Sequence, residues 1–89
     1  MANFMIEMPH SDQQCLAALD QLAEQSSELL NNTWWGCMAG KHDGWAMIQA
    51  ADSSEAQNMV PEALRDQVTI TEVSKFTPDQ IQQMHRMAA

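Results

Sequence analysis

The order in which strand-like and helix-like segments follow one another constrains the fold more than any single residue. Asn3–Met8 alternates apolar and polar positions with a period of two, which is typical of a strand. From Asp12 to about Leu30, leucines recur with a period near 3.6, which predicts an amphipathic helix. Ser11 and Gln14 have the spacing of a capping box at its start.

Two further strands are predicted on either side of a glycine-rich turn. Thr33–Met38 and Trp45–Ala50 are strand-like runs separated by AGKHDG, whose glycines and Asp-Gly pair are typical of a hairpin. Asp52 and Glu55 then have the spacing of a helix cap. Pro61 interrupts this second helix, so we expect a kink or a restart there.

The rest of the chain supplies a fourth strand and a last helix. Val68–Val73 is rich in β-branched residues, and Thr77–Gln80 places a cap and a proline at a helix start. The complete order is strand, helix, strand, strand, helix, strand and a C-terminal helix. We therefore expect one α+β domain, residues 1–89, with the ferredoxin-like split βαβ order. Its helices would cover one face of a four-stranded antiparallel sheet and leave the other face free for a partner.

Charge and cysteine content argue against several classes of protein. The 89 residues include 12 acidic and 4 basic side chains, a net charge of -8. The bases are scattered, which disfavours nucleic acids and anionic membrane surfaces as partners. No apolar run approaches the ~18 residues that span a bilayer, and the N-terminus does not read as a secretory leader. Two cysteines in a chain without a recognisable leader are more often reduced thiols than a disulfide framework, so we expect a cytoplasmic protein.

Rare residue types gather in the segment 33–48, which holds all three tryptophans and all three glycines. In a split βαβ fold the first two strands run parallel, so the start of the first helix and the hairpin lie at the same end of the sheet. Thiolates and imidazoles together suit zinc, copper or nickel, and two of each favour tetrahedral zinc. The sequence therefore predicts a transition-metal site formed by His10, Cys15, Cys37 and His42.

Other interpretations of these residues stay open. The spacing matches no zinc-finger pattern, and the third strand separates the first two by about 10 Å, so one metal cage requires the loop after the first strand to curl inward. Cys15 in the first turn of a helix would have a lowered pKa, which favours redox or nucleophilic chemistry. The cluster could also be purely structural. Asp43 is expected to serve the turn before Gly44 rather than to orient His42.

A resemblance covers nearly the whole chain. It is carried by the runs MPHSDQQCLAALDQL, WGCMAGKHDGWAMI, NMVPEALRDQ and VSKFTPDQI. Within them the specific segments are Pro9-His10, Trp35-Gly36-Cys37, Gly40 with His42, Val60-Pro61 and Lys75-Phe76-Thr77. The chain resembles an uncharacterised family of small prokaryotic proteins. Its layout is similar to the dimeric α/β-barrel superfamily, which includes muconolactone-isomerase-like and nickel-responsive small ferredoxin-like proteins.

This resemblance implies a fold and a homodimer that pairs sheet to sheet, and it implies no particular reaction. Many members of the superfamily hold a small ligand between sheet and helices. By position, the mouth of that cleft would meet His10, Cys37 and His42, with Trp35 as an apolar wall that binds the ligand. We therefore expect a homodimer that binds a small ligand, with a zinc, nickel or copper ion as the first candidate. The alternatives are a cofactor-free isomerase or monooxygenase with His10 as catalytic base, and a pure interaction module.

Overall fold

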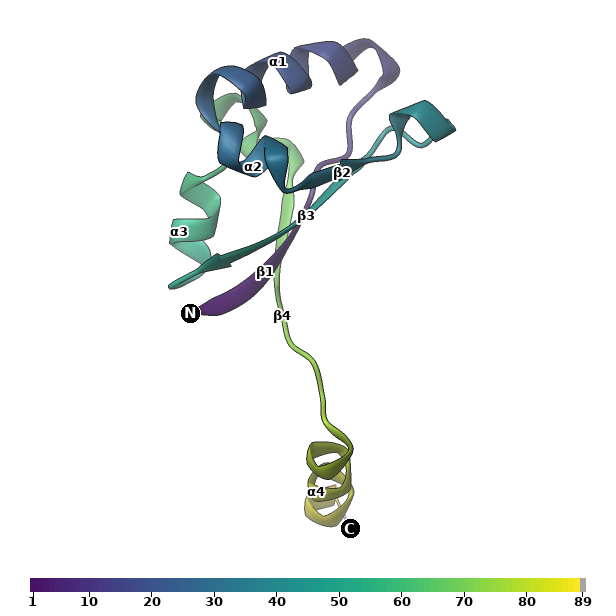
Figure 1. Ribbon diagram of the computed structural model, residues 1–89, viewed down its shortest axis with the longest axis vertical. Coiled ribbons are helices and arrows are strands. Elements are labelled where there is room, and N and C mark those ends of the chain that lie inside the picture. The colour runs from purple at the N-terminus through teal and green to yellow at the C-terminus, as the bar shows by residue number, and fades with distance from the viewer. Residues whose placement is uncertain (89) are drawn as a thin grey trace.

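The computed structural model describes residues 1–88 and shows an α+β fold with one antiparallel sheet (Figure 1). Its strands lie in the order β2-β3-β1-β4. Both β1 and β2 pair antiparallel with β3, so they run parallel to each other, as predicted. This arrangement is consistent with a ferredoxin-like fold. The strands are β1 (Ala2–Glu7), β2 (Thr33–Trp35), β3 (Gly44–Ala50) and β4 (Thr69–Val73).

Three helices lie on one side of the sheet, and a fourth stands apart from it (Figure 1). The helices are α1 (Cys15–Gln25), α2 (Ser27–Asn31), α3 (Ser53–Asn58) and α4 (Pro78–Ala88). Short 3-10 turns occupy Asp12–Gln14, Cys37–Ala39 and Glu62–Gln67. Among the described residues, no helix has the length and apolar character needed to cross a membrane.

The core lies between the sheet and the first three helices. Strand alternation buries Phe4 and Ile6 on the helix side of β1. Leu22 of α1 and Leu29 of α2 pack against them, and both are fully buried. Each buried side chain of this size contributes about 1.5–3 kcal/mol to folding. This packing fixes α1, and therefore the residues at its start, relative to the sheet.

The single helix predicted from Asp12 to Leu30 is wrong, because the chain forms a 3-10 turn and two helices there. The backbone leaves the helical region at Ser26, where φ is -149° and ψ is 61°. The Ser26 hydroxyl donates a hydrogen bond of 2.7 Å to the Met59 carbonyl, which stabilises the break. The predicted capping box of Ser11 and Gln14 is confirmed, and it caps the 3-10 turn that precedes α1.

The hairpin also differs from its prediction, because β2 ends at Trp35 instead of running to Met38. The next residues form a 3-10 turn, and Gly40 ends that turn with a φ of 88°, which favours glycine. The backbone N–H of Gly36 donates to the Asp43 carbonyl at 3.0 Å. This hydrogen bond closes the turn, because it joins the residue that follows β2 to the residue that precedes β3.

The cap and the interruption of the third helix are as predicted. The Asp52 carboxylate accepts a hydrogen bond of 2.9 Å from the Glu55 N–H. Met59, Val60 and Pro61 then separate α3 from the 3-10 turn Glu62–Gln67, so the chain restarts as a tighter helix after the proline.

Glu7, at the end of β1, shares a hydrogen bond with a buried carboxylate. Asp43 is 4% exposed, and its Oδ1 accepts a hydrogen bond of 2.8 Å from the Gly44 N–H, so its predicted turn role is confirmed. The pKa of Glu7 is raised above its ordinary value, because its carboxyl group hydrogen-bonds to Asp43 and because the Asp43 charge repels the ionised form.

We predict that Glu7→Gln raises the free energy of unfolding at pH 7 and that this gain disappears in acid. A raised folded-state pKa means that the stability from protonated Glu7 is fully present below the unfolded pKa, near 4.5. It is lost as the pH rises through the folded pKa. Glutamine keeps the hydrogen-bond donor without the charge. Urea unfolding at several pH values measures the effect, with the exposed Glu24→Gln as control. An equal effect of Glu7→Gln at every pH would contradict the prediction.

Candidate metal centre

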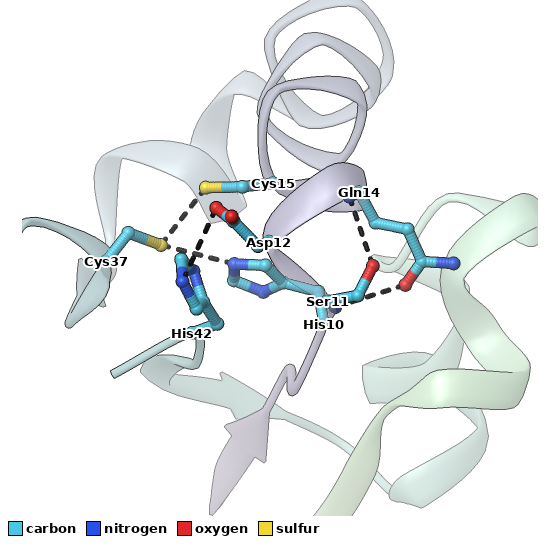
Figure 2. A network of polar contacts seen from close by, with 7 residues as sticks. All are labelled: His10, Ser11, Asp12, Gln14, Cys15, Cys37 and His42. Atoms are coloured by element: carbon cyan, nitrogen blue, oxygen red, sulfur yellow. Dashed lines mark hydrogen bonds and ion pairs between the residues drawn. The ribbon is translucent and has the colours of Figure 1, made fainter. Parts of the chain in front are cut away.

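Two histidines and two cysteines from four separate segments meet at one end of the sheet (Figure 2). His10 follows β1, Cys15 begins α1, Cys37 begins the turn after β2, and His42 precedes β3. One donor atom from each side chain lies within 4.8 Å of the others, and all four residues are half-buried. The predicted convergence is confirmed, and this group could hold a metal ion.

The loop after β1 curls toward the hairpin because backbone pairing continues past the end of the strand. The Met8 N–H donates to the Gly44 carbonyl at 2.8 Å, and the His10 N–H donates to the His42 carbonyl at 3.2 Å. The two imidazole rings consequently lie with their centroids 5.9 Å apart. Since β3 is the neighbour of β1, the residues that lead into β3 bridge the gap between β1 and β2.

The two thiols lie next to each other and to one imidazole. Cys37 Sγ is 3.1 Å from Cys15 Sγ and 3.1 Å from His10 Nε2. Both cysteines are free thiols. The capped 3-10 turn before α1 places Cys15 at the first position of the helix, on the side that faces the hairpin (Figure 2).

The hydrogen bonds of His10 determine which ring nitrogen carries its proton. Nδ1 lies 3.1 Å from the Met8 carbonyl oxygen, which can only accept, so Nδ1 is the protonated nitrogen. Nε2 therefore accepts from the Cys37 thiol, and Cys37 Sγ accepts in turn from Cys15. The neutral ring thus directs a lone pair toward the two sulfur atoms.

In His42 the two ring nitrogens have the opposite roles to those in His10. Its Nε2 lies 3.5 Å from Asp12 Oδ1, and its Nδ1 is buried without a hydrogen-bond partner. A carboxylate at one ring nitrogen holds the proton there and leaves the other nitrogen free to bind a metal. An unpartnered buried nitrogen costs free energy, and a metal ion at the cluster would supply the missing partner.

The pKa of the Cys15 thiol is raised, contrary to the lowering that we expected from the helix dipole. The main cause is its hydrogen bond to Cys37, followed by desolvation and by the repulsion of a neighbouring thiolate. The carboxylate of Asp12, in the 3-10 turn before α1, also disfavours the thiolate. Without a metal, Cys15 is therefore a weaker nucleophile than the sequence suggested.

Trp35 lies against the site from the core side. Its ring contacts His10 edge-on, with centroids 5.8 Å apart and planes at 62°. A cavity of about 10 Å³ remains beside these two rings, lined also by Met8 and Pro9, and it has room for about one water molecule. Trp35 therefore supports the His10 ring by packing.

Asp12 is the contributor to this site that the sequence analysis missed. Its side chain is 87% exposed, yet it points at His42 (Figure 2). The available signal was its position between His10 and Cys15, directly after the capping serine. An acidic residue in the first turn commonly stabilises the helix dipole, so the sequence alone gives no reason to assign Asp12 to the site.

The donor set fits a tetrahedral metal ion. In a zinc site with two sulfur and two nitrogen ligands, neighbouring donors are about 3.3–3.8 Å apart. Here the closest pairs are 3.1 Å apart and all lie within 4.8 Å. Small side-chain adjustments would therefore bring the four donor atoms to the spacing of such a site.

We compared the chain with protein-family models, curated proteins and solved structures, and none of the three comparisons gives a match. The geometry of the site itself therefore carries the functional argument.

We predict that Gly44→Ala destabilises the protein and displaces Trp35. A Cβ at position 44 would lie 2.7 Å from the Trp35 ring, so the ring must move, at a cost of about 1–3 kcal/mol. Urea unfolding followed by tryptophan emission measures both effects.

Gly40→Ala is the control, because a Cβ there meets no atom within 4 Å although its φ is +88°. Its cost is backbone strain of about 1–2 kcal/mol, with native emission unchanged. If both variants gave the same native emission as the wild type, Trp35 would not be packed against Gly44.

Proposed function

We propose that this protein binds one transition-metal ion, zinc(II) foremost, through two thiolates and two imidazoles. The observation that carries the proposal is the convergence of four soft or borderline donor atoms within 4.8 Å of one another. Two sulfur and two nitrogen ligands in a tetrahedral arrangement are the set that zinc prefers. Nickel and copper share these donors and are the alternative ions. The proposed ligands are His10, Cys15, Cys37 and His42.

The hydrogen bonds around the cluster support this proposal, because they prepare each ring for a metal. The Met8 carbonyl fixes His10 with Nε2 toward the sulfurs, and Asp12 fixes His42 with Nδ1 free. Such partners raise the basicity and fix the orientation of metal-bound imidazoles. In our proposal Trp35 forms the apolar wall that limits water access at His10.

We further propose that the chain is a ferredoxin-like homodimer of the dimeric α/β-barrel type. The strand order and the helices on one face support this fold. The opposite face carries two cross-strand apolar pairs, Met5 with Met47 and Trp34 with Trp45. Trp34 is 82% exposed and Met47 49% exposed, and apolar surface of this kind favours pairing between copies.

Catalysis with His10 as general base is the second candidate, and it has less support. Both ring nitrogens of His10 already have protein partners. The adjoining cavity of about 10 Å³ is far smaller than pockets that enclose organic ligands, which measure ~300 Å³ or more.

A cytoplasmic location suits the reduced thiols and stays a prediction.

We predict that the reduced, metal-free protein binds one zinc ion per chain and that Cys37→Ser weakens binding by at least about 100-fold. Removing a direct ligand costs more than the 10–100-fold typical of residues behind the ligands. Competition with a chromophoric chelator measures the affinity, and thiol modification with and without zinc reports protection of both cysteines.

His85→Ala is the control, because His85 lies exposed on α4, the helix that stands apart from the sheet (Figure 1). Its affinity should equal that of the wild type. Equal affinity of Cys37→Ser and the wild type would overturn the proposed ligand set.

We predict that Asp12→Asn lowers zinc affinity about 10–100-fold, because the His42 ring loses the carboxylate that holds its proton. The stability of the metal-free protein should change by less than about 1 kcal/mol, since the pair is largely exposed. Asp20→Asn, an exposed position on α1, is the matched control and should bind zinc normally. A loss of stability without a loss of affinity would assign Asp12 a purely structural role.

A further inference from the structure

The C-terminal helix leaves the body of the protein without covering any part of it. Every residue from Ser74 to Ala88 is exposed. Figure 1 shows α4 at the end of an extended linker that continues from the C-terminal end of β4, away from the sheet. The radius of gyration is 16.0 Å, and the longest dimension is 51 Å. A compact chain of this length has a radius near 12 Å, so the C-terminal segment is an arm.

The sequence specifies this helix in spite of its isolation. The Thr77 hydroxyl accepts from the Gln80 N–H at 3.1 Å, and the Gln80 side chain accepts from the Thr77 N–H at 2.8 Å. Phe76 and Ile81 occupy the two positions of a hydrophobic staple. Nevertheless, a helix of 11 residues is marginal in water by itself. Its stability therefore depends on a surface against which it packs.

One side of α4 is suited to such packing. Ile81, Met84 and Ala88 follow the spacing i, i+3, i+7 and form an apolar stripe. Ile81 is 45% exposed and Met84 52% exposed, and Phe76 before the helix is 59% exposed. Gln82 and Gln83 lie on the other side. The arm thus presents a narrow apolar side that is left exposed by the rest of residues 1–88.

The open face of the sheet offers a matching groove at its β2 edge. The groove has a volume of about 460 Å³. Its floor is formed by the open-face pairs of β1, β2 and β3, and the end of α2 forms its rim. The residues that line it are Met5, Asn31, Asn32, Trp34, Trp45, Ala46 and Met47.

The strand order indicates that the occupant of this groove comes from a second copy of the chain. The arm leaves from β4, at the edge of the sheet opposite β2, and it extends away from the sheet. A second copy provides an identical arm and an identical groove. A two-fold dimer therefore fills both grooves at once.

The distribution of charge favours the same occupant. Residues 1–73 contain eleven acidic and two basic side chains, whereas residues 74–89 contain one acidic and two basic side chains. Two bodies of this charge repel each other, but the arm has the opposite net sign. Electrostatics thus draws the arm of one copy toward the body of the other.

We propose that α4 of each copy packs its Ile81–Met84 side into the β2-edge groove of the other copy, so that the dimer is closed by exchanged arms. This inference rests on the proposed homodimer and is independent of the metal. In this dimer the arm covers the Trp34–Trp45 pair at the β2 edge, and the Met5–Met47 pair nearer the centre of the sheet is left for the contact between the two sheets. Trp34, the most exposed aromatic side chain of the groove, is the main contact for the arm.

The test is sedimentation of the full, metal-free chain in reductant over a range of concentrations. We expect the wild type to have twice the chain mass of 10.0 kDa. Ile81→Asp should raise the dimer dissociation constant at least about 100-fold, because each dimer loses two buried anchors. Gln82→Asp places the same charge one residue away, on the other side of α4, and should stay within about threefold of the wild type.

Tryptophan emission and circular dichroism supply an independent readout. On dilution through the dissociation range, Trp34 should become accessible to a collisional quencher and the helical signal of α4 should fall. A dimer that survives Ile81→Asp unchanged would overturn the exchanged arm while leaving pairing of the sheets. A wild type that is monomeric at all concentrations would overturn both. Zinc binding is measured separately, so neither outcome bears on the metal site.

Discussion

The arrangement of the site depends on backbone pairing that continues beyond the sheet proper. Two hydrogen bonds, from Met8 to Gly44 and from His10 to His42, join the chain leaving β1 to the chain entering β3. Backbone groups in a half-buried loop need such partners, so these bonds hold two loops that are over thirty residues apart. These two hydrogen bonds fix where the imidazoles and thiols lie, and the packing of Trp35 depends on the same contact.

Much of this arrangement could be predicted from the sequence, because it follows from order and periodicity. The approximate positions of the four strands, the helix caps at Ser11, Asp52 and Thr77, and the end of the sheet that collects cysteines and histidines all come from local patterns and their order. What could not be predicted depends on contacts between distant residues. The break at Ser26 is stabilised by the Met59 carbonyl, and the leucine pattern continues across it. The orientation of His42 by Asp12 likewise needs the folded turn.

The polar groups around the cluster determine the tautomers of its two histidines. A carbonyl holds the proton of His10 at Nδ1 and a carboxylate holds the proton of His42 at Nε2, so the free nitrogen is Nε2 in His10 and Nδ1 in His42. The thiols form a chain of hydrogen bonds that ends at His10, which holds them in place before any proton is displaced. Little reorganisation would separate this arrangement from the metal-bound state that we propose, and side chains that are positioned in advance bind more tightly.

The shortest strand has a consequence for how the protein can be observed. In β2, the alternation of side chains sends Trp34 to the open face and Trp35 to the helix face beside His10. Two neighbouring indoles therefore lie on opposite sides of one sheet, one on the open face and one at the cluster. Replacing Trp45 and one of these two with phenylalanine leaves a single indole, so the emission of each face can be observed alone.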